Sequence, residues 1–443
     1  MGSFGFIDDL SQPYYMPKFI ADFHIHSHYS RAVSKDMNIG ELDKWAKRKG
    51  IAVMGTGDFT HPEWIKELQE LLQPAPEEGL FILKSAQDTD KATRFVLSVE
   101  ISSIYSKGGK VRKVHTIILA PSFEVAQEIN KQLGRRGNLH SDGRPILGLD
   151  VKELAKLVFA VSDKCMVIPA HAWTPWFSVF GSKSGFDSLE ECFDELTPQI
   201  YAIETGLSSD PLMNWRVANL DSVALISNSD SHSGRKIGRE ANIFEGEMNY
   251  LAIHEAIKYG APALADEREN KSAKLLSTIE FFPEEGKYHH DGHRACKISW
   301  LPSETKAHGG KCPVCGKKVT VGVMSRVDDL ATRSLNERPE GAPRFTSMVP
   351  LEEIISSALG VGVVSKAVQK EYNHLLEAFG NEFEILLEAD IARIANETKL
   401  IIGEAIKRVR EGKLHIEPGY DGEFGKVEIF TEEERNKFKI NSI

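Results

Sequence analysis

Short runs of apolar and β-branched residues recur along the first half of the chain, and each run ends at polar side chains. The runs cover residues 19–23, 51–56, 94–100, 114–120, 166–170, 201–205 and 223–230. Runs of this length, bounded by polar residues, predict buried β-strands. Several stretches between them, residues 39–50, 62–72 and 123–134, carry apolar residues at helical spacing. The first half of the chain is therefore predicted to alternate strands with amphipathic helices.

Strands that alternate with helices predict a parallel sheet covered by helices. The polar residues that follow the strands are mainly histidine, aspartate and glutamate, and they come from most of the strands. An open sheet gathers its ligands where the strand order reverses, whereas a barrel collects side chains from the carboxyl ends of many strands. We therefore predict an α/β fold in which the strands close into a barrel.

The histidine and carboxylate side chains at these strand ends are the candidate metal ligands. They are His24, His26, Asp58, His61, Glu100, His115, His171, Asp230 and His232. The predicted catalytic residues among them are His26, Asp58, His171 and Asp230. Imidazole and carboxylate ligands suit divalent zinc, manganese, iron or magnesium better than a metal selected by thiolates. Because one catalytic zinc uses only three or four ligands, we expect two or three ions.

Two of these histidines have a second interpretation. His61 lies directly before a predicted helix and could cap it, and His115 lies within a strand, where a core or surface role is open. A single histidine at a strand end is often structural. A whole set of histidines and carboxylates at one end of a barrel is not, because buried charges need partners that a metal provides.

A cluster of divalent ions lowers the pKa of a bound water to about 7 and holds both the attacking and the leaving oxygen of a phosphoryl group. The reaction that suits such a cluster is the hydrolysis of a phosphate ester.

Three of the five cysteines form a second candidate metal site. Cys296, Cys312 and Cys315 lie with His293 in the paired spacing of a zinc ribbon. Four ligands with no position left for water would make a closed, structural zinc site. His289 and His290 are alternatives to His293 as the fourth ligand, and the sequence leaves that choice open.

The two metal motifs, a linker rich in proline and glycine and the return of helical spacing after it divide the chain into three predicted parts. Residues 1–285 form the barrel, residues 286–350 a zinc-binding segment with its linker, and residues 351–443 a helical region that ends in a hairpin. The chain has a net charge of −10, whereas residues 286–350 hold 11 lysines and arginines against 6 aspartates and glutamates, a net charge of +5. A basic segment on an acidic protein is either a nucleic-acid contact or a solvated surface.

No run approaches the roughly 18 apolar residues of a membrane span, and the first residues lack the basic and apolar parts of a secretory signal. Isolated or metal-spaced cysteines also suit a reducing compartment. We therefore expect a cytoplasmic protein that does not bind a membrane.

The metal motifs resemble those of the PHP superfamily of metal-dependent phosphoesterases over residues 19–265. The His24-x-His26 pair, Asp58, Glu100, His171 and the Asp230-x-His232 pair carry this resemblance. It implies a distorted barrel of seven β/α units. The chain departs from the superfamily pattern at Phe59, where a histidine is common, and at Ser30 and Arg31, where many members carry a further ligand.

A narrower resemblance extends over nearly the whole chain. The stretches ADFHIHSHYSRAVSKDMNI, GTGDFTHPEW, AHAWTPWFSVFGSKSGFDSLEECF, SNSDSHSGRKIGREAN and KCPVCGKKVTVGVMSRVDDLATR are similar to the endonuclease Q family of DNA repair nucleases. The resemblance implies cleavage of DNA on the 5′ side of hypoxanthine, uracil, xanthine and abasic sites, which leaves a 3′-hydroxyl and a 5′-phosphate.

Aromatic and basic residues near the predicted metal site are candidate DNA contacts. Trp173, Trp176 and Phe177, with Phe180, follow His171 and could stack on an extruded base or form an apolar cluster under the loop. Basic candidates that could meet phosphates or simply be solvated are Lys107, Lys110, Arg112, Lys113, Arg235, Lys236, Arg239 and Arg326. A replication sliding clamp is an open partner, since no terminal stretch identifies one.

The leading hypothesis is a lesion-specific DNA endonuclease. The alternative is a PHP-type phosphatase that acts on a small phosphomonoester, which would leave the zinc-binding segment and the aromatic loop without a use. A DNA-binding protein with an inactive barrel is a third reading, which the nearly complete ligand set disfavours.

Overall fold

The seven apolar runs predicted from the sequence all form strands around the apolar interior of the first half of the chain. The structure is a computed structural model that describes residues 16–88 and 90–441. The strands are β1 (Lys18–Asp22), β2 (Val53–Gly55), β5 (Arg94–Lys107), β6 (Lys110–Ala120), β8 (Met166–Pro169), β9 (Ala202–Glu204) and β10 (Ala224–Ile226). Phe19, Ala21 and Phe23 alternate along and just past β1 and are buried among the other strands. This is the period of two that a strand gives to its inward face.

Backbone hydrogen bonds connect these strands into a ring. β1 pairs with β2 and β2 with β5, then β5 with β6 and β6 with β8, and β9 pairs with β10. Just past β8, the amide of Ala172 donates to the carbonyl of Glu204 at 2.9 Å. Ile25, past β1, bridges to Ser231, past β10. The ring is a distorted barrel, so the predicted fold class is confirmed.

The prediction of a parallel sheet is wrong for β5, β6 and β8, which are antiparallel neighbours. β5 and β6 form one long hairpin whose turn, Gly108 and Gly109, has φ angles of 61° and 71°. Without a helix between them, the two strands must run in opposite directions. Glu100 and His115 therefore lie within the hairpin, where His115 pairs with Ser102 in register.

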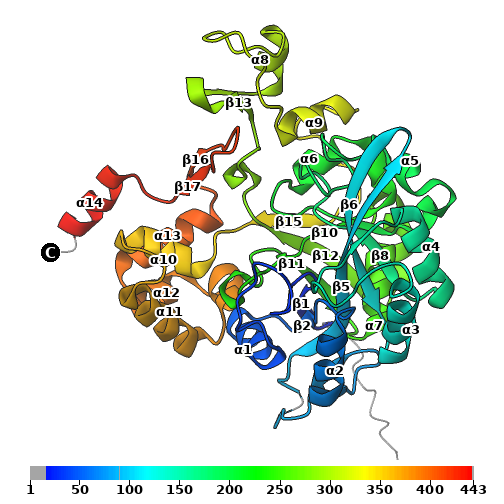
Figure 1. Ribbon diagram of the computed structural model, residues 1–443. Helices are drawn as coiled ribbons and strands as arrows, with labels where there is room; N and C mark the ends of the chain where they lie inside the picture. Colours follow the sequence, from blue (N-terminus) through cyan, green and yellow to red (C-terminus); the bar gives the residue numbers. More distant parts are fainter. Residues whose placement is uncertain (1–15, 89, 442–443) are drawn as a thin grey trace, which may run out of the picture.

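Further strands extend the sheet on both sides. β11 (Ala241–Gly246) runs antiparallel to β1, β12 (Ala273–Glu280) lies beyond β11, and β15 (Arg344–Ser347) runs parallel to β12. The zinc-binding segment leaves the sheet after β12, and the chain returns as β15 (Figure 1). The strands beside β5 are β3 (Leu72–Pro74), β4 (Phe81–Leu83) and β7 (Ile146–Leu147); β4 and β7 pair with β5 and β3 pairs with β4.

The three predicted helices are confirmed as α1 (Ile39–Lys49), α2 (Pro62–Leu71) and α3 (Phe123–Leu133). α1 begins at the side chain of Asn38, which accepts a hydrogen bond from the amide of Glu41, and ends at Gly50, with φ 92°. The remaining helices of this part are α4 (Val151–Val161), α5 (Leu189–Phe193), α6 (Pro211–Trp215), α7 (Tyr250–Lys258) and the 3₁₀ turns η1 (Asp194–Gln199), η2 (Ala218–Ser222), η3 (Gly234–Lys236) and η4 (Pro262–Asn270).

The zinc-binding segment consists of short elements joined by turns. They are η5 (Pro283–Glu285), just before it, β13 (Asp291–His293), η6 (Arg294–Cys296), β14 (Ile298–Trp300), α8 (Pro302–Ala307) and α9 (Val323–Leu330). β13 and β14 form an antiparallel hairpin. The segment stands at one end of the barrel, on the side toward which the β5–β6 hairpin projects (Figure 1).

The C-terminal part has more helices than the two or three that the sequence predicts. They are α10 (Leu351–Leu359), α11 (Lys366–Phe379), the π-helical turn η7 (Glu384–Glu388), α12 (Ile391–Glu397) and α13 (Leu400–Arg410). The predicted terminal hairpin is present as β16 (His415–Glu417) and β17 (Lys426–Glu428), and α14 (Glu432–Asn441) follows it. The hairpin reaches the zinc-binding segment, where Tyr420 bridges to His290.

The helical region lies beside α1 of the barrel (Figure 1). A buried ion pair joins the two parts. The ammonium of Lys49 lies 2.7 Å from the carboxylate of Glu382, and the two side chains are 2% and 4% exposed. Glu382 also accepts hydrogen bonds from the hydroxyl of Tyr372 and the amide of Leu351. A Cβ at Gly50 would lie 2.3 Å from Asn381, so only glycine permits this close approach.

Within residues 16–88 and 90–441, no helix is both long and apolar enough to cross a membrane.

Candidate metal centre

The first group of converging ligand atoms forms where β1 ends. His24 and His26 lie two residues apart on the extended chain, so both rings point to the same side of the barrel. The Nε2 atom of His26 lies 3.3 Å from Glu100 Oε2 and 3.2 Å from Asp230 Oδ1. The Nε2 atom of His24 lies 3.6 Å from the same two oxygens. Four side chains from three separate parts of the chain thus face one point.

A second group shares Glu100 with the first. Its other oxygen, Oε1, lies 2.7 Å from Nδ1 of His115 and 3.0 Å from Nε2 of His171. The two imidazole nitrogens lie only 3.2 Å apart. The β5–β6 hairpin brings Glu100 and His115 together, and the turn after β8 adds His171. Glu100 therefore stands between two groups, each with the ligand atoms of a metal site.

Buried atoms without hydrogen-bond partners test whether these groups suit a metal. Nε2 of His24, Nε2 of His26 and Oδ1 of Asp230 are buried, and none of them makes a hydrogen bond within the described part of the chain. Buried polar atoms are almost always paired, so three unpaired atoms that face one another point to a missing partner. Nitrogen and carboxylate donors suit a divalent ion such as zinc or manganese.

The opposite nitrogens of the two histidines are held by carboxylates. Nδ1 of His24 lies 3.0 Å from Glu204, and Nδ1 of His26 lies 3.0 Å from Asp58. This arrangement places the proton on Nδ1 and leaves the lone pair of Nε2 free for a metal. Glu204 also accepts the amide of His171 at 2.8 Å, so one side chain orients ligands in both groups.

Asp58, a predicted ligand, therefore does not face the two groups. It lies behind His26 and accepts hydrogen bonds from the amide and hydroxyl of Ser27 and from the hydroxyl of Ser30. A Cβ at Gly143 would lie 2.2 Å from this carboxylate, so a glycine is needed for the packing. Its physical role is to orient His26.

His61 and His232 also lie outside the two groups. His61 begins α2 without a side-chain capping bond, and its ring stacks on Tyr29 with centroids 4.2 Å apart. His232 lies at the rim, one-third exposed, with its ring centroid 4.8 Å from that of His26. Its Nδ1 lies 2.9 Å from the backbone carbonyl of Asp230, which leaves Nε2 as its free nitrogen.

The concentrated charges shift the pKa values of the site residues. Burial alone would lower the pKa of His24, but the surrounding carboxylates, led by Glu204, raise it well above its usual value. Burial would raise the pKa of Glu100, yet its neighbours, His115 first and then His24 and Arg144, hold it well below its usual range. Glu100 and Asp230, whose pKa values are both lowered, are ionised at neutral pH, so a metal ion competes with protons for the histidine nitrogens.

The backbone is strained at three of the strand-end residues. Asp58, His171 and Asp230 have φ angles of 50°, 31° and 45°. Residues other than glycine rarely adopt positive φ, and such strain concentrates at functional sites because the geometry there is needed for another purpose. Here His171 and Asp230 contribute to the two ligand groups, and Asp58 contacts His26.

Arg144, which the sequence does not single out, adds a positive charge at the rim of the site. Its guanidinium lies 3.0 Å from Glu100 Oε2, and its side chain is 27% exposed. A guanidinium in this position can bind an oxyanion that approaches the site.

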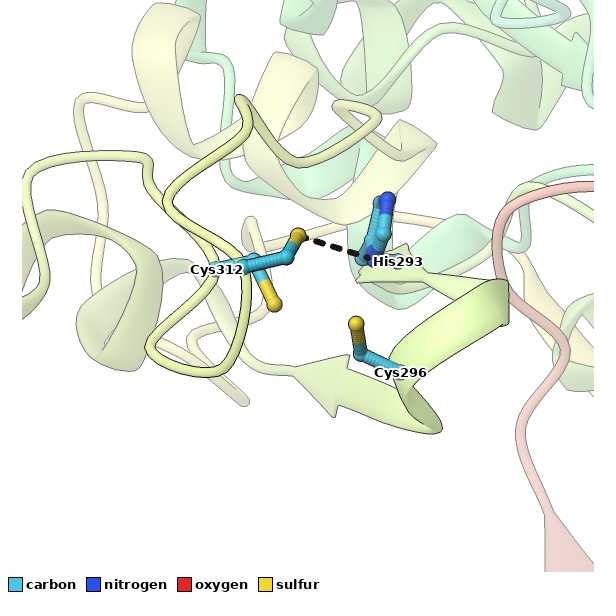
Figure 2. Close-up of side chains that lie close together, drawn as sticks. His293, Cys296 and Cys312 are labelled. Carbon is cyan, nitrogen blue, oxygen red and sulfur yellow. Dashed lines mark hydrogen bonds between the residues drawn. The ribbon is translucent and has the colours of Figure 1, made fainter.

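The cysteine cluster is a separate candidate zinc site. One ligand atom each from His293, Cys296, Cys312 and Cys315 lies within 4.8 Å of the other three. Figure 2 shows the labelled side chains pointing toward one another from the turn after β13 and from the facing loop. His289 and His290 instead stack on each other, with centroids 5.3 Å apart. The geometry therefore favours His293 as the fourth ligand.

The aromatic loop after His171 divides into a buried and an exposed part. Trp173 is 1% exposed and donates to Asn214 from its indole nitrogen, and Phe180 is also buried. Neither ring has a free face, so the stacking prediction does not suit them. Phe177 is half-buried against His115, whereas Trp176 is 50% exposed.

The basic candidate DNA contacts are mostly engaged within the protein. Arg235 and Lys236 form ion pairs with Glu352 and Glu353 of α10. The guanidinium of Arg239 donates to the backbone carbonyl of Ser229. These interactions fix the loop after Asp230 rather than present free cations to a ligand.

Arg326, on α9, connects the zinc-binding segment to the aromatic loop. It donates to the carbonyls of Phe180 and Phe186 and pairs with Asp187 at 2.6 Å. Its side chain is 14% exposed, so it too is a structural contact.

Comparison with known proteins places these features in a family. Residues 350–413 match the family model of the MJ0043 C-terminal domain. The uncharacterized protein MJ0043 of Methanocaldococcus jannaschii is 33% identical over 265 residues, which are 58% of this chain and 31% of MJ0043. The chain thus spans about a third of the length of that relative.

Two solved structures resemble nearly the whole chain. The lesion-specific endonuclease PfuEndoQ from Pyrococcus furiosus is 32% identical with a TM-score of 0.81, over 96% of this chain and 99% of that one. Endonuclease Q in complex with a 27-mer duplex that has an abasic lesion at the active site is 32% identical with a TM-score of 0.79, over 94% and 98%. With this identity over almost the full length of both chains, the protein belongs to the endonuclease Q family.

Proposed function

We propose that this protein is a metal-dependent endonuclease that cuts DNA at lesions. Its substrates are DNA strands with deaminated bases, namely hypoxanthine, uracil and xanthine, and strands with abasic sites. It hydrolyses the phosphodiester on the 5′ side of the lesion. The solved complex of endonuclease Q with an abasic duplex supports DNA as the substrate, since that protein resembles this chain over nearly its full length.

The position of Glu100 between the two ligand groups is the observation that carries the proposal. Two divalent ions that share one carboxylate lie close enough to hold the attacking and the leaving oxygen of one phosphodiester. We propose His24, His26, Glu100 and Asp230 as ligands of one ion, and Glu100, His115 and His171 as ligands of the other. A third ion would need His61 or His232, which lie outside both groups.

The metal ions, when bound, supply the activated water that attacks the phosphorus. Glu204 and Asp58 hold His24 and His26 in the orientation that a metal needs. Arg144, at the rim, would bind a non-bridging oxygen of the scissile phosphate and oppose the charge that develops on it. His232, with its free nitrogen at the rim, would contact the same phosphate.

A pocket beside the metal centre suits an extruded nucleotide. It has a volume of about 320 Å³ and is lined by Thr174, Pro175, Trp176, Leu207, Ser208, Pro283, Gly286, Lys287, Tyr288, His289, Val323 and Phe424. The hydroxyl of Thr174 lies 3.2 Å from Nδ1 of His171, so the pocket begins next to the second ligand group. Enzymes that act at a damaged base take the nucleotide out of the helix and hold it in such an aromatic pocket.

A nicking assay tests the proposal. Duplexes of one sequence carry a central deoxyadenosine, deoxyinosine, deoxyuridine or abasic site and are incubated with zinc, manganese or magnesium. We expect cuts 5′ to the three lesions only, and we expect the Asp230→Asn variant to lose them, because Asp230 provides an oxygen to the first ligand group.

Turnover of phosphomonoesters without any cut in the lesion duplexes would overturn the proposal and favour a phosphatase. Circular dichroism of Asp230→Asn controls for folding, because the substitution removes no apolar packing. The metal content of the protein, measured by mass spectrometry, gives the number and identity of the ions.

A further inference from the structure

A second hollow begins on the other side of Trp176, over the outer half of the β5–β6 hairpin. It has a volume of about 680 Å³, and its lining is mostly polar or charged: Lys110, Val111, Arg112, Lys113, Trp176, Gly181, Ser182, Lys183, Ser184, Gly185, Asp187, Glu191 and Arg326. We call it the hairpin groove. Nothing in the metal centre or the aromatic pocket uses its lysines.

The two carboxylates of the groove are already neutralised. Arg326 pairs with Asp187 at 2.6 Å, and Arg112 pairs with Glu191 at 2.9 Å. The side chain of Arg112 is only 6% exposed and stacks on Phe186, 4.0 Å from the ring centroid. These two arginines therefore build the floor and cancel its negative charge.

Three lysines of the groove have no such partner. Among the residues that the structure describes, no carboxylate lies within 4.0 Å of the ammonium groups of Lys110, Lys113 or Lys183. Lys110 and Lys183 are exposed, and Lys113 is half-buried. The groove thus presents three unpaired positive charges above a neutral floor, which is the arrangement that attracts a polyanion.

The groove is joined directly to the metal centre through β6. Lys113 and His115 are two residues apart on this strand, so their side chains leave the same face about 7 Å from each other. The amide of His115 donates to the carbonyl of Phe177 at 3.0 Å, and the hydroxyl of Ser184 donates to the carbonyl of Lys113 at 3.2 Å. The wall formed by residues 174–187 is therefore fixed to the strand that carries the ligand.

An exposed aromatic ring stands at the edge of the groove. The ammonium of Lys113 lies 5.0 Å from the centroid of Trp176, whose side chain is half exposed. Trp176 also lines the aromatic pocket, so it separates the two hollows. A half-exposed ring beside lysines without carboxylate partners is the combination that holds a locally unstacked nucleic-acid strand.

We propose that the hairpin groove binds the DNA strand next to the scissile phosphate, with Lys110, Lys113 and Lys183 on its phosphates and Trp176 stacked on a base. This inference rests on the proposed function, because it takes DNA as the substrate. It assigns contacts with the DNA strand to the barrel itself, in addition to any contact that the zinc-binding segment makes.

The salt dependence of DNA binding tests the lysines. The variant Lys110→Gln/Lys113→Gln/Lys183→Gln is compared with Lys156→Gln/Lys164→Gln/Lys258→Gln, which removes the same charge outside the groove. Binding of the abasic duplex is measured by fluorescence anisotropy between about 50 and 300 mM salt. Over this range the Debye length shortens, so the screening of exposed charges increases. Three lost phosphate contacts should reduce the slope of log affinity against log salt by about 2.7.

Trp176 is tested by Trp176→Ala and Trp176→Phe. We expect Trp176→Ala to weaken binding of the abasic duplex by about tenfold or more, since one base–ring stack is lost, and Trp176→Phe to restore most of it. In the triple lysine variant, turnover of a small chromogenic phosphodiester should equal that of the unmodified protein, because no ligand of the metal centre changes.

The outcomes separate this inference from the proposed function. The proposed DNA-binding role of the groove would be overturned by an unchanged salt slope in the groove variant, or by an equal fall of the slope in the control variant. The proposed role of the groove is also overturned if the unmodified protein does not bind DNA, or if it binds RNA of the same sequence more tightly. If the unmodified protein binds but does not nick lesion DNA, and the slope still falls in the groove variant only, the groove stands and the proposed function fails.

Discussion

The carboxylate of Glu204 lies 3.0 Å from Nδ1 of His24 and so fixes the ring whose opposite nitrogen faces the first ligand group. Because the same carboxylate accepts the amide of His171, Glu204 supports both groups without belonging to either.

Replacing Glu204 with glutamine should weaken metal binding in the barrel by about 10- to 100-fold, since the orienting carboxylate of His24 is lost. A calorimetric titration of the demetallated variant with zinc or manganese measures the change in metal affinity. Glu190→Gln, which changes an exposed residue of α5, serves as the control. An unchanged affinity would mean that His24 is held by other contacts.

Replacing Cys312 with serine should release one zinc ion and destabilise the zinc-binding segment, because a thiolate ligand is lost from a closed site. The metal of the barrel should remain. Metal analysis and limited proteolysis give the two readouts, and Cys165→Ser, a buried cysteine far from this cluster in the chain, should lose no metal. Loss of all metals in Cys312→Ser would show that the two sites depend on each other.

Replacing Glu382 with glutamine should lower the free energy of unfolding by about 3–5 kcal/mol, because Lys49 is then buried without a counter-charge. The double variant Lys49→Met/Glu382→Gln removes both charges and should be less destabilised than Glu382→Gln alone. Urea unfolding measures both. Lys49→Met is measured as the second single variant, and if the effects of the two single variants simply add in the double variant, the pair does not act as a unit.

Glu280 should make the protein less stable as the pH rises. Burial raises the pKa of Glu280 from 4.5 to about 8. The unfolded chain ionises this carboxyl near pH 4.5, while the folded protein keeps the proton up to about pH 8. The free energy of unfolding therefore keeps the full contribution of Glu280 below pH 4.5. It falls between pH 4.5 and about pH 8, by up to about 1.4 kcal/mol per pH unit.

Glu280→Gln should remove this fall, since glutamine can still accept the hydroxyl of Thr205 and carries no titrating proton. Guanidinium unfolding at pH 5, 7 and 9 compares the variant with the unmodified protein. Parallel curves for the two proteins would show that Glu280 does not titrate in this range.

The strand pattern of the sequence locates most of the metal centre, because the ends of successive barrel strands meet at one place. His24, His26, Glu100, His171 and Asp230 all follow or end predicted strands, and the structure brings them within ligand distance. His115 joins them for a different reason. It faces Glu100 across a hairpin, and the short Gly108–Gly109 turn is the sequence signal for that hairpin.

The sequence does not separate a carboxylate that faces a metal from one that faces a histidine. Asp58 and Glu204 both come at the end of an apolar run, and both lie behind a ligand. Their direction depends on backbone geometry, such as the positive φ of Asp58, which no residue pattern predicts.

The charged surface was equally hard to predict from the sequence, because pairing depends on distant segments. Arg235 and Lys236 lie next to Asp230 in the chain, yet α10 supplies their partners more than a hundred residues later. Among the described residues, Lys110 and Lys183 form no ion pair, whereas Arg112 and Arg326 pair with Glu191 and Asp187 of the same groove.

The pairing of β12 with β15 has a mechanical consequence for the zinc-binding segment. A segment attached at one end can swing on its linker, whereas this one leaves from β12 and returns to a neighbouring position of the same sheet. It has no single hinge. Its position is held by the pairing of β12 with β15 and by the contacts of Arg326 on α9, whereas a zinc ion held by His293 and the three cysteines would shape the segment itself.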